Sequence, residues 1–92
     1  MNKKGEKVII DTREQHEFEK SHVDGARNIP PHKFMNGEAV KELKEVKKDT
    51  CIILYCRSGA RSNTCSKILE DAGYTNLVNG FNEHRVRKLL LG

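Results

Sequence analysis

Short, unbroken apolar runs occur in a chain that is otherwise rich in charge. Two of them, VII at residues 8–10 and CIILY at residues 51–55, show no alternation of apolar and polar positions. Runs of this length without alternation are typical of strands that are buried on both faces of a parallel sheet. A third, shorter strand is predicted at residues 77–78 (LV).

The segments between these strands have helical features. Thr12 and Gln15 have the spacing of a capping box, which predicts a short helix that ends near Lys20. A charged surface helix is predicted from Glu38, and a last helix over residues 81–91. Apolar residues at helical spacing support the surface helix and predict a further helix after the second strand; they are Val40, Leu43 and Val46, then Cys65, Ile68, Leu69 and Ala72.

Turn residues separate these elements. Asp24-Gly25 predicts a turn, residues 28–31 (NIPP) should be extended, Asp49-Thr50 ends the surface helix, and Gly73 caps the helix before it. Strands that alternate with helices predict an α/β domain with a central, mostly parallel sheet and helices on both faces. At this length, residues 1–92 are expected to form a single domain.

Composition narrows the class of protein further. No apolar run approaches the ~20 residues needed to cross a bilayer, so no membrane span is predicted. The start, MNKKGEKVII, has lysines but no apolar core behind them, and we expect no signal peptide. Three cysteines cannot close into a full disulfide framework, which favours a reducing compartment such as the cytoplasm.

The net charge of +4 is modest, and acidic and basic residues are interleaved. Aromatic residues make up only 5% of the chain, so it lacks the basic, aromatic-rich surface of a nucleic-acid-binding protein. We expect no nucleic-acid partner. A small basic domain without an obvious apolar surface is expected to be a monomer.

The candidate chemistry lies in the loop CRSGAR at residues 56–61, directly after the second strand and before a helix. Ligands of open α/β sheets bind beyond the carboxyl ends of the strands. The N–H groups of the loop and of the helix start can form an anion cradle, and Gly59 permits a conformation closed to most residues. The helix dipole and nearby guanidinium groups should lower the pKa of Cys56 from ~8.5 toward neutrality. Arg57 and Arg61 add positive charge for an anionic substrate.

These residues resemble the active-site segment of single-domain rhodaneses. IDTR at residues 10–13 resembles the family's opening Asp-x-Arg strand end, and EF follows at residues 17–18. SHVDGARNIP at residues 21–30 is similar to its GHIxGAxNIP pattern, and LEDAGYTNL at residues 69–77 to its LxxxGYxNV pattern. The resemblance covers about residues 8–78.

The sequence departs from this pattern in two places. Ser21 stands where the family usually has glycine. After the third strand, the usual Gly-Gly and a later tryptophan are reduced to Asn79-Gly80-Phe81, and the chain contains no tryptophan. The end of the domain is therefore abbreviated, which affects the packing of the last helix more than the chemistry.

The resemblance implies a three-layer rhodanese-like fold and a sulfurtransferase activity. In rhodaneses the cysteine thiolate takes the outer sulfur of thiosulfate or a similar sulfane donor, becomes a persulfide, and passes that sulfur to cyanide, a thiol or a protein acceptor. On this sequence Cys56 is the nucleophile, and Arg61, or less strongly Arg57, neutralises the sulfite-like part of the donor. No metal or organic cofactor is implied. The backbone that holds the persulfide belongs to Arg57, Ser58, Gly59, Ala60 and Arg61.

Two other functions are alternatives to sulfur transfer. Cys-dependent phosphatases share the fold but place five residues between cysteine and arginine, whereas Arg61 follows Cys56 after only four. A tighter cradle suits one sulfur atom better than a phosphate. The chain could instead be a persulfide carrier or docking module that serves a partner protein, and the presence of Cys56 is compatible with that alternative.

Several residues have a structural interpretation. Cys51 lies in a strand and Cys65 on a buried helical stripe, so both are expected to be packing residues. Arg13 and Arg27 are expected to pair with neighbouring carboxylates, for which Asp11 or Glu17 is available. His22 is expected to be a structural residue near the turn. The other histidines share no metal-ligand spacing with the cysteines, so no zinc site is predicted.

Overall fold

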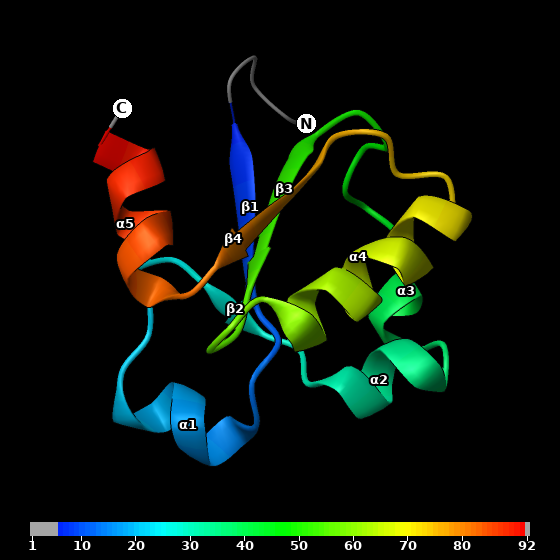
Figure 1. Ribbon diagram of the computed structural model, residues 1–92. Helices are drawn as coiled ribbons and strands as arrows, with labels where there is room; N and C mark the ends of the chain where they lie inside the picture. Colours follow the sequence, from blue (N-terminus) through cyan, green and yellow to red (C-terminus); the bar gives the residue numbers. More distant parts are fainter. Residues whose placement is uncertain (1–5, 92) are drawn as a thin grey trace.

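The computed structural model describes residues 6–91, which are built around a four-stranded sheet (Figure 1). All neighbouring strands are parallel, which confirms the predicted α/β class. The strands lie in the order β2-β1-β3-β4. They are β1 (Lys7–Asp11), β2 (Arg27–Asn28), β3 (Cys51–Tyr55) and β4 (Leu77–Phe81).

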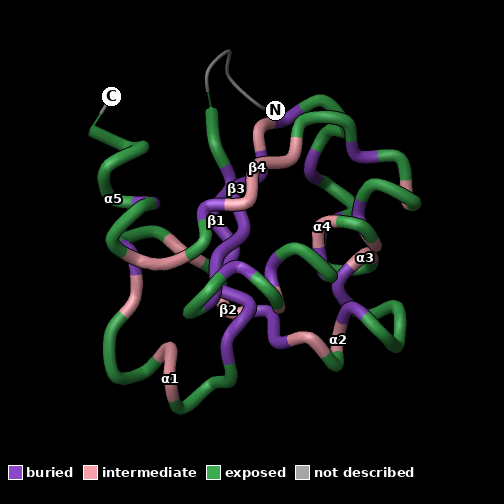
Figure 2. The backbone as a smooth tube through the Cα atoms, viewed as in Figure 1, coloured by how far each residue is buried: buried purple, intermediate pink, exposed green. Residues whose placement is uncertain are grey.

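The unbroken apolar runs are explained by burial on both faces of the sheet. Successive side chains of a strand point to opposite faces, so Ile10, Ile52 and Leu54 enter one core cluster and Ile9 and Ile53 enter the other. The two central strands are buried along most of their length (Figure 2). A polar residue at either parity would face a core, which is why the runs do not alternate.

Five helices of the described residues 6–91 surround this sheet. Figure 1 shows α2, α3 and α4 on one side, α5 on the other, and α1 beyond the carboxyl ends of the strands. The helices are α1 (Gln15–Lys20), α2 (Pro31–Met35), α3 (Glu38–Glu42), α4 (Ala60–Asp71) and α5 (Glu83–Leu91). Within residues 6–91, no helix combines the length and the apolar character needed to cross a bilayer.

The predicted cap of the first helix is wrong. The helix begins at Gln15 after an N-cap at Glu14, whose N–H donates to the Glu17 carboxylate at 2.9 Å. Thr12 is buried, and its hydroxyl donates instead to the carbonyl of Tyr55 at 2.9 Å. Thr12 therefore joins the carboxyl ends of two neighbouring strands, which a local spacing rule does not detect.

Three other boundaries differ from the prediction. Pro31 is the first residue of the unpredicted helix α2, because proline fits the first turn of a helix, where its missing N–H costs nothing. Helix α3 ends at Glu42, and the chain after it forms tight turns. Leu43 and Val46 lie beyond the helix but are buried, as the spacing of the apolar residues predicted. Phe81 ends β4 rather than beginning the last helix.

Candidate active site

Cys56 lies at the carboxyl end of β3, where the chain turns toward α4. Its side chain is almost fully buried, with 2% of the residue exposed. Its N–H donates to the carbonyl of Phe81 at 3.1 Å, so the loop is fixed to β4 from its first residue. The turn closes at Gly59, which has a φ of 94° in the left-handed region, and α4 begins at the next residue.

Hydrogen bonds surround the sulfur of Cys56. The N–H of Gly59 donates to Sγ at 3.1 Å, and the hydroxyl of Ser62 lies 3.6 Å from it. Burial raises the pKa of Cys56, but bonds from Ser62 and from the N–H groups of Ser58 and Gly59 outweigh it and lower the pKa from 9.0 to about 7. The direction agrees with the expectation from the sequence. The largest favourable contributions come from hydrogen bonds, not from arginine charges.

Alkylation should reveal this acidity. The thiolate fraction of Cys56 increases as the pH rises through its pKa, so the rate of iodoacetamide modification is expected to reach half its maximum near pH 7. A Cys51→Ser background removes the partly exposed thiol, and burial raises the pKa of Cys65 to about 12, so Cys65 should not contribute. A midpoint near the ordinary value of ~8.5 would contradict the hydrogen-bond argument.

The side chain of Asn79 in β4 holds the Cys56 loop in place. The Ser62 hydroxyl donates to Asn79 Oδ1 at 2.7 Å, its shortest contact, and Asn79 Nδ2 donates to the Gly59 carbonyl at 3.1 Å. The same Asn79 oxygen accepts the N–H of Phe81 at 3.1 Å. One side chain of β4 thus links the loop, the first turn of α4 and the end of its own strand.

The guanidinium of Arg61 is paired with Glu17 of α1. Arg61 Nη1 lies 2.9 Å from Glu17 Oε1, and this ion pair lowers the pKa of the carboxyl to about 2. Arg57 reaches the same carboxylate at 3.9 Å, but its side chain is 76% exposed. Glu17 therefore ties the loop to α1, and of the two loop arginines Arg57 is the freer.

A pocket of about 560 Å³ opens over Cys56, between α1, the loop and the start of α5. Arg61 is not among the residues that line it. Five basic or titratable nitrogen side chains line the pocket, against the two carboxylates of Glu17 and Glu83. They are Arg13, His16, Lys20, Arg57 and His84.

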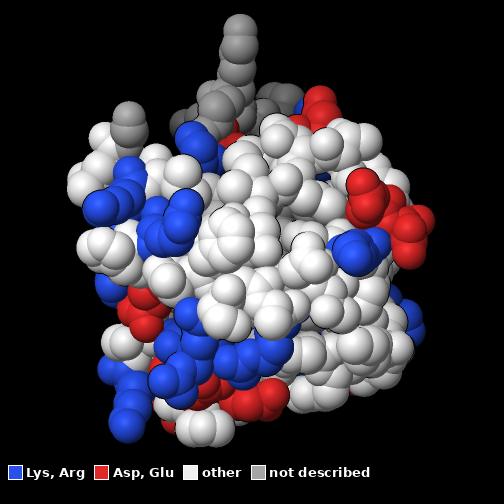
Figure 3. Space-filling view, viewed as in Figure 1, with Lys and Arg blue, Asp and Glu red and all other residues white. Residues whose placement is uncertain are grey.

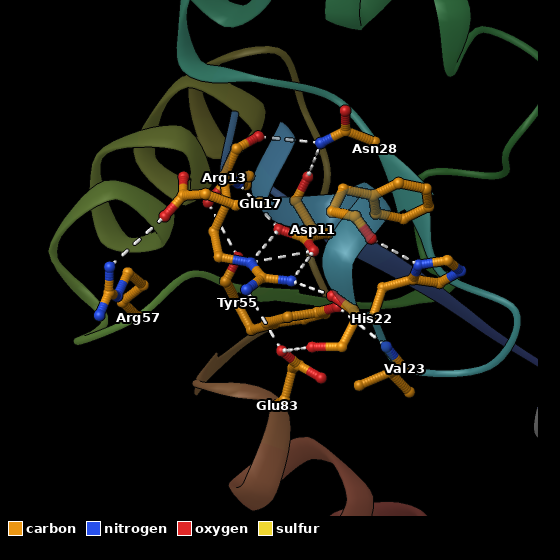
Figure 4. Close-up of polar contacts among 12 residues, drawn as sticks. Asp11, Arg13, Glu17, His22, Val23, Asn28, Tyr55, Arg57 and Glu83 are labelled. Carbon is orange, nitrogen blue, oxygen red and sulfur yellow. Dashed lines mark hydrogen bonds and ion pairs between the residues drawn. The ribbon is translucent and has the colours of Figure 1, made fainter. Parts of the chain in front are cut away.

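A buried ion-pair network supports the floor of this pocket (Figure 4). Arg13 binds both oxygens of Asp11, the shortest contact being 2.7 Å, and pairs with Glu83 at 3.2 Å. It also donates to the carbonyl of Ser21 at 2.6 Å. The predicted pairing of Arg13 with Asp11 is confirmed.

His22 stacks on Phe18, and its Nδ1 lies 2.8 Å from the Phe18 carbonyl oxygen, a structural contact.

Of the predicted cradle, the structure thus places Ser58 and Gly59 at the sulfur of Cys56. Arg57 and Arg61 extend to Glu17, and Ala60 starts α4 with its side chain exposed. Sequence reasoning missed four contributors: the hydrogen bonds of Ser62 to Cys56, the ion pair of Glu17 with Arg61, the Asn79 link and the contact of Phe81 with the loop. The unusual Asn79-Gly80-Phe81 segment signalled the last two. Nothing local in the sequence signals an ion pair between positions 17 and 61.

A cysteine in the loop between a strand and a helix of a parallel α/β sheet is typical of a class of cysteine-dependent enzymes and carriers. Residues 1–84 match the family described as "Rhodanese-like domain". The chain belongs to this rhodanese-like domain family.

Two sequence relatives and one solved structure are among the proteins that are similar to this chain. "Uncharacterized protein YqhL" of Bacillus subtilis is 38% identical over 77% of this chain and 52% of its own length. "Putative thiosulfate sulfurtransferase, mitochondrial" of Schizosaccharomyces pombe is 35% identical over 78% of this chain and 56% of its own length. The solved structure "rhodanese with anions from E. coli" has a TM-score of 0.75 and 26% identity, covering 87% of this chain and 91% of that one. The chain spans about half the length of these two sequence relatives.

Proposed function

We propose that this domain transfers a sulfane sulfur from thiosulfate or a similar small anionic donor to a thiophilic acceptor. The Cys56 thiolate attacks the outer sulfur of the donor, a new S–S bond forms, and sulfite leaves with the electron pair of the broken S–S bond. Cyanide or a thiol then attacks the outer sulfur of the persulfide and restores the thiolate. No external oxidant or reductant is needed, and no metal or organic cofactor takes part.

One observation carries this proposal: a thiol with a pKa of about 7 lies at the base of a pocket whose rim includes the cationic side chains of Lys20 and the exposed Arg57. The thiolate supplies the nucleophile near neutral pH, and the rim attracts an anion. The similarity to a protein named thiosulfate sulfurtransferase supports the same choice of donor.

Intact-mass measurement tests the proposal directly. The full chain is incubated with thiosulfate, and a gain of one sulfur, about 32 Da, is expected. Cyanide should remove that mass with release of thiocyanate. If no mass is gained while the protein remains folded, the proposal fails.

The phosphatase alternative is tested in the same preparation. The loop places four residues between Cys56 and Arg61, one fewer than a phosphatase loop, so hydrolysis of a chromogenic aryl phosphate is not expected. A persulfide carrier would form the same persulfide but turn over slowly with free cyanide.

We further propose that the domain acts as a monomer in a reducing compartment such as the cytoplasm.

The two loop arginines are expected to have different roles. Arg57→Ala removes an exposed charge at the pocket rim and should raise the KM for thiosulfate severalfold while sparing the transfer from preformed persulfide to cyanide. Arg61→Ala breaks the clamp to Glu17 and should slow both half-reactions, each by about tenfold or more.

Glu17→Gln distinguishes a positioning role of Arg61 from a direct one. If Arg61 holds the loop through Glu17, this variant reproduces the defect of Arg61→Ala in stopped-flow measurements of both half-reactions. If Arg61 instead binds the donor, removing its carboxylate partner frees the guanidinium and accelerates the first half-reaction. Because Arg57 also reaches Glu17, acceleration that persists in an Arg57→Ala background would assign the donor-binding role to Arg61.

A further inference from the structure

A second pocket, of about 710 Å³, runs along the surface between β4 and α5. β4 is an edge strand of the sheet, since the strand order ends with it. Gly80 lets α5 approach the strand, because a Cβ there would collide with Val86. We name this feature the β4/α5 groove. Its walls include Val78, Phe81, His84, Arg85, Lys88 and Leu89.

The groove combines apolar surface with positive charge. Phe81 is 41% exposed and Leu89 49% exposed, although both are large apolar residues. Arg85, Lys88 and His84 line the groove with them, and none of its lining residues is acidic. Figure 3 shows the uncharged area over β4 with Lys and Arg side chains beside it over α5. An occupant that complements this groove is acidic and carries apolar side chains.

Phe81 holds a conformation that glycine would adopt without cost. Its φ is 70°, and among residues 6–91 it is the single non-glycine residue with positive φ. The strand pairing shifts at this point, so that Tyr55 pairs with Phe81. The ring extends beside Gly59 of the catalytic loop, and the guanidinium of Arg85 lies 4.8 Å from its centre. A strained residue with an exposed ring next to a reactive loop indicates a binding role for that ring.

The β4/α5 groove adjoins the pocket over Cys56. Asn82 and His84 line both. Cys56 itself is only 2% exposed, so a bulky folded surface cannot reach its sulfur directly. An extended segment lying along an edge strand can enter between α1 and the loop, and such strands commonly receive extended peptides.

We infer that the β4/α5 groove binds an extended segment of a partner protein, and that this segment carries both acidic and apolar side chains. Binding there brings the group of the partner that donates or accepts sulfur to Cys56. This inference rests on the proposed sulfur transfer and adds the partner's chemistry to it. The Phe81 ring and Leu89 hold the apolar side chains, and Arg85 and Lys88 pair with the carboxylates.

A peptide probe tests the inference. The probe is a fluorescein-labelled octapeptide of alternating Glu and Leu, compared with Lys/Leu and Glu/Ser octapeptides by fluorescence anisotropy at low and moderate salt. Only the Glu/Leu peptide is expected to bind well, and added salt should weaken it. The double variant Arg85→Glu, Lys88→Glu should reduce its affinity by about tenfold or more. The control Lys44→Glu, Lys47→Glu makes the same charge change at exposed positions outside the groove and should leave the affinity unchanged.

Phe81→Gly tests the ring without straining the backbone. This variant relieves the positive φ, so its melting temperature should not fall, yet its affinity for the Glu/Leu peptide should. Equal binding of all three peptides, or equal loss in the groove and control variants, would overturn the inference. Self-association of the wild type that the double variant abolishes would also overturn it, because the occupant would then be a second copy.

Persulfide formation is measured in parallel. The Arg85→Glu, Lys88→Glu variant should still gain one sulfur from thiosulfate, since neither residue lines the pocket over Cys56. Loss of this mass gain in the variant alone would make the groove part of the catalytic pocket and overturn the inference. Absence of the gain in the wild type would refute the proposed function, while peptide binding would still report on the groove.

Discussion

Replacing Cys56 with serine is expected to abolish sulfur transfer. The chemistry depends on a thiolate with a pKa of about 7, and a serine hydroxyl is not ionised at that pH. The loss in thiosulfate:cyanide turnover should exceed about a thousandfold, because Cys56 is the one cysteine among the residues that line the pocket. The mass gain with thiosulfate should vanish at the same time.

The matched control is Cys51→Ser. Cys51 begins β3, at the opposite end of the strand from the loop, and is partly buried. This variant should keep most of the wild-type turnover, with a modest loss of stability. Residual transfer by the Cys56→Ser protein, or loss of transfer in the control with an unchanged melting temperature, would show that the nucleophile has been misassigned.

Arg13→Ala is expected to be the most destabilising single change near the site. It leaves the carboxylate of Asp11, which is 0% exposed, buried without its ion-pair partner. Breaking a buried pair from one side typically costs about 3–5 kcal/mol, a large share of the roughly 5–14 kcal/mol expected for a domain of this length. Thermal unfolding without substrate should show a decrease of roughly 12 °C or more.

Arg87→Ala provides the comparison on the surface. Arg87 pairs with the same Glu83 at 2.9 Å, one turn away on α5, but its side chain is 53% exposed. Exposed pairs of this kind contribute at most about 1 kcal/mol, so the melting temperature should change by a few degrees. Similar small shifts in both variants would show that the Arg13 network is structurally dispensable.

Much of the fold could be predicted because its strongest signals are local. The apolar runs that form β1 and β3, and the stripe with Cys65 and Leu69 in α4, each depend on neighbours within a few residues. The wrong prediction of the first helix cap concerns a side chain whose hydrogen-bond partner lies far away in the sequence. Thr12 has the side chain of an N-cap residue, but its hydroxyl is satisfied by the carbonyl of Tyr55 in another strand.

The candidate site was predictable in the same partial way. Cys56, the turn at Gly59 and the helix behind it follow one another in sequence, so their geometry could be inferred before the fold was known. The contacts that fix this loop come from Glu17 and Asn79, which no local rule connects to it. Only the strand order brings α1, the loop and β4 to one edge of the sheet.

The pairing of β1 with β3 also has a consequence for how the chain folds. Lys7 lies beside Cys51 and Asp11 beside Tyr55, so the central ladder joins segments separated by more than forty residues. Closing so long a loop costs entropy before any contact repays it, which makes folding slower than in helical domains of equal size. The loop with Cys56 also needs the end of β4 in place, because the Cys56 N–H donates to the Phe81 carbonyl. During synthesis a reactive thiolate therefore forms only after nearly the whole domain has left the ribosome, and the unfinished chain carries an ordinary, less reactive cysteine.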